Sequence, residues 1–242
     1  MITNNFFDFL SRKLKEVQET EIKAIEEAAK LIVDSINKGG RFYVFGTGHS
    51  HIIAEEIYLR AGGLAYVNAV LPTELMLHEL ALKSTYVERI EGYANHLVDL
   101  YKMSAEDTLM VVSNSGRNAV PVDLCLEAKK RGLSIIVITS VKAGKGVASR
   151  HSSGYKIADL ADVVIDNCAD EGDASYYIDN FDIPVGPLSD FTGVAIAQAL
   201  MADVVDELVK QGHKPPVFKS SNLDGADEYN DELFDKYYGY WK

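Results

Sequence analysis

Apolar residues are arranged along the chain in two ways, as short continuous runs and as longer segments in which they recur every three or four residues. The short runs predict buried strands over residues 41–45, 64–68, 108–112, 134–139 and 162–166. Most of the periodic segments lie between these runs, and they predict helices. Alternating strands and helices require right-handed crossovers, so the pattern predicts an α/β protein with a doubly wound, parallel, five-stranded sheet flanked by helices.

The first predicted helix is the longest. The helices are expected at residues of about 4–37, 50–61, most of 72–101, 119–131 and about 190–210. The helix over 4–37 ends at Gly39-Gly40 and is too long merely to cap a sheet, so we expect it to pack on a second subunit. The tail over 213–242 is acidic and too rich in aromatic residues for a disordered segment, so we expect it to pack on another surface. Its last aromatic residues are Phe234, Tyr237, Tyr238, Tyr240 and Trp241.

Composition limits the class of protein. The chain has 242 residues, 47% of them hydrophobic and 25% charged, which suits one globular domain over 1–242 with a sizeable core. The net charge of −12 disfavours nucleic acid and anionic membranes as partners. We expect a reduced, cytoplasmic protein for three reasons. The chain has only two cysteines, Cys125 and Cys168, its N-terminus lacks signal-peptide character, and it contains no apolar run of membrane-spanning length.

Two strand–turn–helix units carry the candidate chemistry. The strand at 108–112 runs into Ser113-Asn114-Ser115-Gly116-Arg117-Asn118, the second loop, and a helix follows at once. The strand at 41–45 runs into Gly46-Thr47-Gly48-His49-Ser50, the first loop, which also precedes a helix. Free N–H groups and the positive end of the helix dipole meet at such a turn, so each loop suits an anion, and a phosphate monoester above all.

Either loop alone is weak evidence, because glycine-rich turns reverse the chain in many α/β proteins. Two loops of this kind at the carboxyl edge of one parallel sheet favour a single phosphate-bearing ligand held between them. A dinucleotide site fits poorly, because His51 occupies the third glycine position of that fingerprint.

The two loops and the strand at 134–139 resemble the sugar isomerase (SIS) domain family. The resemblance covers roughly residues 33–211, and the long N-terminal helix is also typical of these proteins. The chain is most similar to stand-alone bacterial SIS proteins of the phosphoheptose isomerase or phosphosugar-binding type. The isomerase domain of glucosamine-6-phosphate synthase and N-acetylmuramic acid 6-phosphate etherase are relatives. The resemblance implies a flavodoxin-like fold, a sugar phosphate ligand and no cofactor.

Carried over residue by residue, the resemblance makes Ser50, Ser113, Ser115 and Asn118 phosphate ligands. The other expected members of the two loops are Gly48, His49, Asn114 and Gly116. Asn118 stands where the family has Thr or Ser, but its amide can still donate. His49 replaces a small or polar residue, and it is a candidate to face the sugar.

An isomerase of this kind needs a carboxylate near C1 and C2 of the open-chain sugar. Glu88 lies where the etherase resemblance places a catalytic glutamate, and Glu91, one helical turn away, is its rival. His78-Glu79 is a second candidate pair, in which His78 would open the sugar ring or bridge subunits. Solvated carboxylates on a helix face and a structural histidine are the alternatives for these four residues. No His or Cys spacing indicates a metal site.

The first interpretation is an aldose–ketose isomerase of a sugar phosphate, forming a homodimer or homotetramer. The second is a lyase or etherase acting on an amino-sugar phosphate with the same carboxylates. The third is a non-catalytic sensor of a sugar phosphate. Fold alone does not choose among them.

Overall fold

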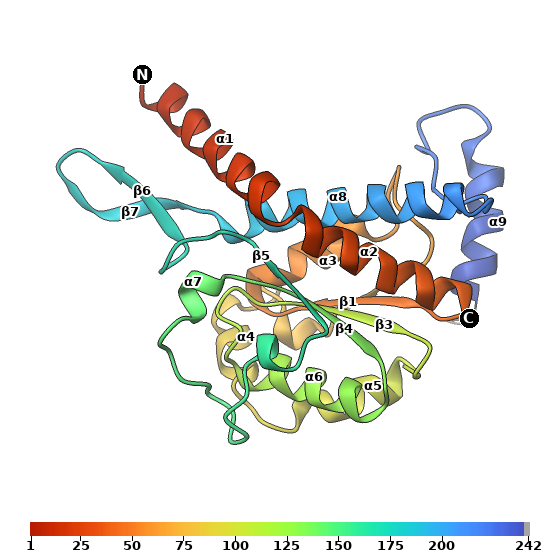
Figure 1. Cartoon of the computed structure of the whole chain (residues 1–242), viewed down its shortest axis with the longest axis horizontal. Coiled ribbons are helices and arrows are strands. Elements are labelled where there is room, and N and C mark those ends of the chain that lie inside the picture. Colours follow the sequence, from red (N-terminus) through yellow and green to blue (C-terminus); the bar gives the residue numbers. More distant parts are fainter. Residues whose placement is uncertain (240–242) are drawn as a thin grey trace.

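A central parallel sheet organises the molecule. The computed structural model describes residues 1–239, and its main sheet has five parallel strands in the order β2-β1-β3-β4-β5 (Figure 1). The strands are β1 Phe42–Gly46, β2 Val67–Val70, β3 Thr108–Val112, β4 Ser134–Thr139 and β5 Val163–Asp166. This is the predicted doubly wound arrangement, with the flavodoxin-like strand order.

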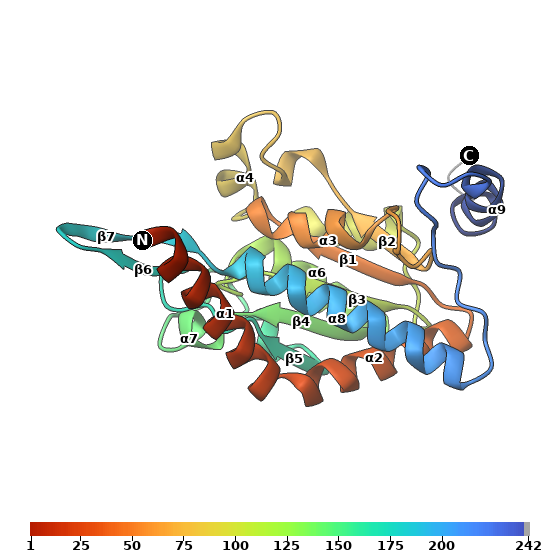
Figure 2. The same ribbon diagram turned by 90° about the horizontal axis from the view of Figure 1, so that it is seen from above.

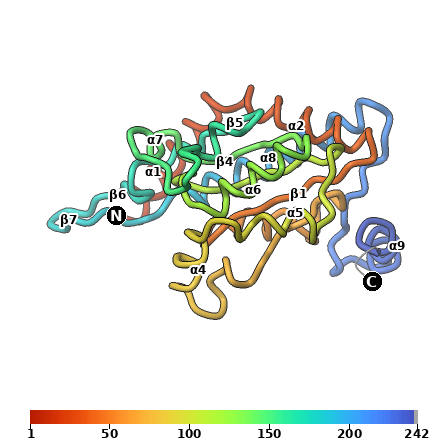
Figure 3. Tube along the Cα trace, turned by 90° about the horizontal axis from the view of Figure 1, so that it is seen from below, coloured from red at the N-terminus to blue at the C-terminus, as the bar shows by residue number. Residues whose placement is uncertain are grey.

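Helices cover both faces of the sheet (Figure 3). One face is covered by α2 (Ile22–Asn37), α3 (His51–Ile57) and α8 (Ser189–Lys210), and the other by α4 (Ala81–Val87), α5 (Leu97–Leu100) and α6 (Ala119–Lys130). Side chains alternate along each strand, so Phe42 and Val44 enter the first layer of the core and Tyr43 and Phe45 enter the second. All four side chains are fully buried.

The predicted N-terminal helix is present, but it is divided at Glu21 into α1 (Ile2–Thr20) and α2. The Glu21 carboxylate accepts a hydrogen bond of 2.9 Å from the Asp166 N–H at the end of β5, which anchors the chain at the bend. Beyond the bend, α1 projects from the domain beside an antiparallel hairpin (Figure 2). The hairpin strands, β6 Ala174–Ile178 and β7 Phe181–Pro187, were not predicted from the sequence.

The segment between β2 and β3 is less regular than predicted. Instead of one mostly helical stretch it contains short pieces separated by turns, and Gly92 has a left-handed backbone with φ of 86°. The short helical turns of the whole domain are η1 Gly48–Ser50, η2 Thr73–Leu75, η3 Tyr93–His96, α7 Val141–Gly144 and η4 Ile157–Asp159.

The C-terminal tail packs along the edge strand β2, as its aromatic residues predicted. Its helix α9 (Ala226–Tyr238) buries Tyr238 against Phe218 and Ala65, and the Tyr238 hydroxyl donates to the Val67 carbonyl at 2.7 Å. Tyr240 and Trp241 lie outside the described residues. None of the helices between residues 1 and 239 combines the length and apolar character needed to cross a bilayer.

Candidate functional site

The first loop is a tight turn that only glycine permits at its start. A Cβ atom on Gly46 would lie 2.4 Å from the Ser50 carbonyl oxygen, so any other residue would force the loop open. The η1 turn follows and leads directly into α3. Ser50 and His49 are accessible at this turn, half-buried and exposed respectively. The predicted first-loop residues therefore stand together at the carboxyl end of β1.

The second loop lies beside the first, because β1 and β3 are neighbours and Gly46 pairs with Val112. Within it, the Ser113 hydroxyl accepts the Gly116 N–H at 3.2 Å, which closes the turn. Gly116 has φ of +62°, and a Cβ there would lie 3.1 Å from the Thr139 hydroxyl, so the position is restricted to glycine. The structure thus brings the two predicted loops to one edge of the sheet.

The N-terminus of α6 is already partly used by the protein. The Val120 N–H donates to the Glu88 carbonyl at 3.0 Å, and Pro121 in the first turn has no N–H to offer. An anion at this helix would therefore be held by the N–H groups and side chains that precede Val120, in the second loop itself. Asn118 is the N-cap residue and is buried.

Three arginines gather at the second loop, and the sequence did not single them out. Arg150 donates through Nη1 to the Asn118 Oδ1 at 2.9 Å and through its N–H to the Arg117 carbonyl at 2.8 Å. Burial lowers the pKa of Arg150, the positive charges of Arg117 and Arg89 lower it further, and the carboxylate of Glu88 opposes them. Within residues 1–239 the Arg117 Nε is buried without a hydrogen-bond partner. A local positive centre therefore exists in a chain of net charge −12.

Glu88 joins the first loop to the second. It caps the C-terminus of α4, and its carboxylate accepts a hydrogen bond of 2.8 Å from the Thr47 hydroxyl, while its carbonyl accepts from Val120 at the start of α6. The side chain is half-buried. Of the four predicted catalytic candidates, this is the one whose carboxylate is bonded to a phosphate-type loop.

Glu91 faces a different segment. Its carboxylate accepts from the Ser152 N–H at 2.7 Å and from the Ser152 hydroxyl at 2.6 Å. These two hydrogen bonds lower the pKa of Glu91, whose side chain is 42% exposed. Next to Ser152, the His151 Nε2 lies 2.9 Å from Asp123 Oδ1, and both side chains are buried. Glu91 and the Asp123–His151 pair thus fasten the loop that carries Arg150.

His78 and Glu79 do not reach the second loop through any contact that the structure records. Glu79 is exposed and forms an ion pair with Lys83. The His78 ring instead lies against the His51 ring, with 5.3 Å between centroids. Burial raises the pKa of Asp190, at the start of α8, and the nearby His49 and His51 oppose this rise.

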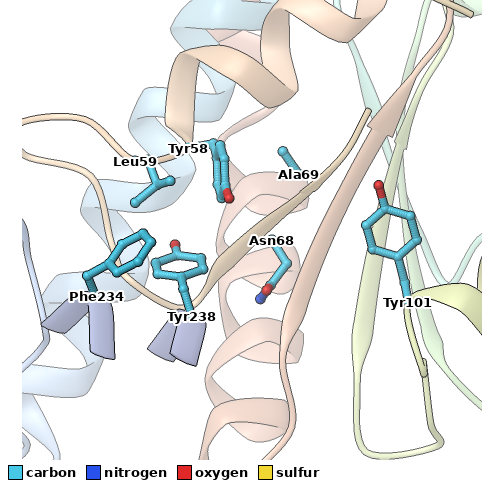
Figure 4. Close-up of a pocket in the computed structure, with 7 residues that line it drawn as sticks. All are labelled: Tyr58, Leu59, Asn68, Ala69, Tyr101, Phe234 and Tyr238. Atoms are coloured by element: carbon cyan, nitrogen blue, oxygen red, sulfur yellow. The ribbon is translucent and has the colours of Figure 1, made fainter. Parts of the chain in front are cut away.

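A large aromatic cavity lies elsewhere, at the edge strand. It has a volume of about 460 Å³ and is lined mainly by aromatic and aliphatic side chains from β2, α9 and the segments that follow α3 and α5 (Figure 4). No lining residue is charged and none belongs to either loop, so the cavity does not suit a phosphate. A smaller cavity of about 250 Å³ adjoins the second loop at Ser115 and Gly116 and includes Lys145 and Lys156.

Comparisons with known proteins agree with the fold. The sequence model of the SIS domain matches residues 5–140. A UPF0309 protein of Halalkalibacterium halodurans is 52% identical over 239 residues, which is 98% of this chain and 99% of that protein. The structure is similar to a phosphoheptose isomerase of Neisseria gonorrhoeae, with a TM-score of 0.54, 17% identity, and coverage of 84% of this chain and 97% of that one. It is also similar to the NanR protein of Vibrio vulnificus complexed with ManNAc-6P, with a TM-score of 0.52, 12% identity, and coverage of 98% and 67%.

Proposed function

Because the chain belongs to the SIS domain family, and within it to the UPF0309 proteins, we propose that it binds a sugar phosphate between its two loops and isomerises it between aldose and ketose. The observation that carries the proposal is the hydrogen bond from Thr47 to the Glu88 carboxylate. It holds a potential base at the first loop, while the backbone of the same residue is bonded to the helix that follows the second loop. A ligand whose phosphate lies on the second loop would have its carbon chain beside Glu88.

The phosphate is proposed to bind the second loop. Its donors are the loop N–H groups before Val120, the hydroxyls of Ser113 and Ser115 and the guanidinium groups of Arg117 and Arg150. The guanidinium groups support this placement, because arginine forms charge-assisted, bidentate hydrogen bonds with phosphate oxygens. The similar structures include a phosphoheptose isomerase and a protein complexed with ManNAc-6P, and both names are consistent with a phosphorylated sugar.

Glu88 is proposed to be the base. It would take the proton from C2 of the open-chain aldose as O1 gains a proton, which gives a cis-enediol, and would then return a proton to C1 as O2 loses its own, so that the protons balance and no cofactor is required. Glu91 is less suitable, because its two hydrogen bonds from Ser152 lower its pKa and make it a weaker base. Glu79 is less suitable because it is exposed and paired with Lys83. The arginine cluster would also stabilise the negative charge that develops on the enediol oxygens.

Exchange of the C2 proton with solvent tests this proposal. The protein would be incubated in deuterated water with pentose, hexose and heptose phosphates, and the C2 signal followed by proton NMR. We expect exchange with at least one sugar, loss of exchange in Glu88→Gln and retention in Glu91→Gln, which changes a carboxylate one turn away. Binding without exchange for any sugar would reject the isomerase and favour a sensor. Loss of a C3 substituent with deuterium at C2 would favour an elimination of the etherase type.

A further inference from the structure

Three metal-ligand side chains from two separate segments converge beside the first loop. His51 is the first residue of α3, Glu55 lies one turn later on the same helix, and His78 comes from the segment between η2 and α4. One ligand atom from each lies within 4.8 Å of the other two. The pair on α3 has i, i+4 spacing, which places both side chains on one face of the helix. His78, 23 positions further along the chain, is brought there only by the fold.

The distances suit a small tetrahedral ion. The His51 Nε2 lies 3.4 Å from Glu55 Oε1, and the His78 Nε2 lies 4.0 Å from the same oxygen. Zinc bonds of about 2.0–2.1 Å in a tetrahedral site put neighbouring ligand atoms about 3.3 Å apart. The first pair already has this separation. The second needs a small rotation of His78, whose side chain is 62% exposed.

The surrounding hydrogen bonds prepare His51 to be a ligand. Its Nδ1 is bonded to the Gly48 carbonyl, and because a carbonyl only accepts, this nitrogen carries the proton. In this tautomer the His51 Nε2 presents a lone pair toward Glu55. A backbone carbonyl that fixes the tautomer in this way is the usual support of a metal-bound histidine. The ring itself is buried, with 3% exposure, so its orientation is set by packing.

We propose that His51, Glu55 and His78 form a zinc site with three protein ligands and a fourth position open to solvent or substrate. Three ligands plus an open position are characteristic of zinc sites that act on a substrate, whereas structural sites are closed by four protein ligands. The exposed side of His78 and Glu55 supplies the open position. The site adjoins the first loop through Gly48 and His51, so a bound ion would lie next to the sugar site. Zinc would bind these three side chains whether or not the two loops hold a sugar phosphate.

Without a metal ion the same cluster has a different chemistry. Two histidine rings would then face one carboxylate oxygen with no ion between them. A zinc site and a metal-free cluster differ in their affinity for zinc and in the number of ions bound per chain, so a direct measurement of zinc binding separates them. Cobalt(II) is a useful probe beside zinc, because four-coordinate cobalt with nitrogen and oxygen ligands absorbs visible light.

The test is titration of the metal-stripped full-length protein with ZnCl₂ by calorimetry and with CoCl₂ by visible absorption. We expect one equivalent per chain and the spectrum of four-coordinate cobalt. Removal of one ligand should weaken zinc binding by at least ~100-fold, since loss of a supporting group alone weakens metal sites by about 10–100-fold. His78→Ala and Glu55→Gln are the preferred variants, because both side chains are exposed and their loss should leave folding intact.

Two matched controls keep the result specific. Glu56→Gln changes the adjacent carboxylate on α3, which pairs with Arg60 and accepts from Gln198, and His213→Ala removes an exposed histidine beyond α8. Both should bind zinc as the unmodified protein does. The proposal is overturned if the unmodified protein shows no saturable zinc binding. It is equally overturned if His78→Ala and Glu55→Gln, shown to be folded by circular dichroism, bind zinc with unchanged affinity.

Discussion

Replacing Asp123 should both destabilise the protein and loosen the arginine site. The Asp123 carboxylate accepts from the His151 Nε2 at 2.9 Å and from the Gly92 N–H at 2.6 Å. It therefore ties α6 to the loop that follows α4 and to the loop that carries Arg150. In Asp123→Ala the His151 Nε2 and the Gly92 N–H would both lose this acceptor.

The size of the effect follows from these two bonds. A hydrogen bond to a charged group contributes about 1.5–3 kcal/mol, so losing two should lower the free energy of unfolding by roughly 3–6 kcal/mol. This agrees with the ~3–5 kcal/mol found when one partner of a buried pair is removed. It is a large share of the ~5–15 kcal/mol that stabilises a typical domain. Asp123→Asn can accept only one of the two bonds and should lose about half as much.

Urea unfolding at neutral pH measures this difference. The matched control is Asp99→Ala, which breaks a 2.7 Å ion pair with Arg131 in which the Asp99 side chain is 64% exposed. That pair should contribute ~1 kcal/mol or less. The reasoning is refuted if the free energy of unfolding of Asp123→Ala lies within ~1 kcal/mol of that of the unmodified protein, since a surface pair alone contributes that much. It is also refuted if the two alanine variants lose the same free energy of unfolding.

Three further predictions concern the ligand, the assembly and acid sensitivity. Replacing both Ser113 and Ser115 with Ala should weaken sugar phosphate binding by at least about 1.5 kcal/mol, because hydrogen bonds to a charged group are lost, and unchanged affinity in calorimetry would remove both residues from the site. The chain should form a homodimer or homotetramer through α1 and the β6–β7 hairpin, where Phe7 is 64% and Ile183 65% exposed. Sedimentation should show the oligomer, and a monomer at micromolar concentration would contradict it. Burial acts to raise the pKa of Asp170, but hydrogen bonds from Ser175, Lys13 and Lys142 outweigh it and lower the pKa from 3.8 to about 2. Its stabilisation is thus present above about pH 4 and lost as the pH falls toward 2, so acid unfolding followed by circular dichroism should be less steep over this range in Asp170→Asn. An equally steep loss in that variant would assign the acid sensitivity to other groups.

The parts of the fold that depend on local pattern could be predicted from the sequence. The strands at 108–112 and 134–139 have the predicted bounds, because both are mostly apolar runs whose apolar residues are buried on two faces. The strand predicted at 64–68 instead begins at Val67, because Leu64 bridges to Val217 and Ala65 packs on the C-terminal tail. The β6–β7 hairpin was missed although Phe181, Ile183 and Val185 alternate along β7, because two prolines and a glycine interrupt that strand and argue against a strand there.

The candidate site, too, could be predicted only where it depends on local sequence. The two loops could be predicted because each is a contiguous turn between a strand and a helix. Arg150 could not, because it reaches Asn118 from 32 positions away along the chain. The metal-ligand cluster was missed for the same reason, since His78 joins His51 and Glu55 only after the chain has folded.

A crystal structure of the protein with a bound sugar phosphate tests the central claim most directly. The account predicts the phosphate on the second loop, with its oxygens bonded to N–H groups before Val120 and to Arg117, and with C2 of the sugar next to the Glu88 carboxylate. It would be contradicted by a phosphate bound away from both loops, or by a sugar whose C2 lies closest to a different carboxylate.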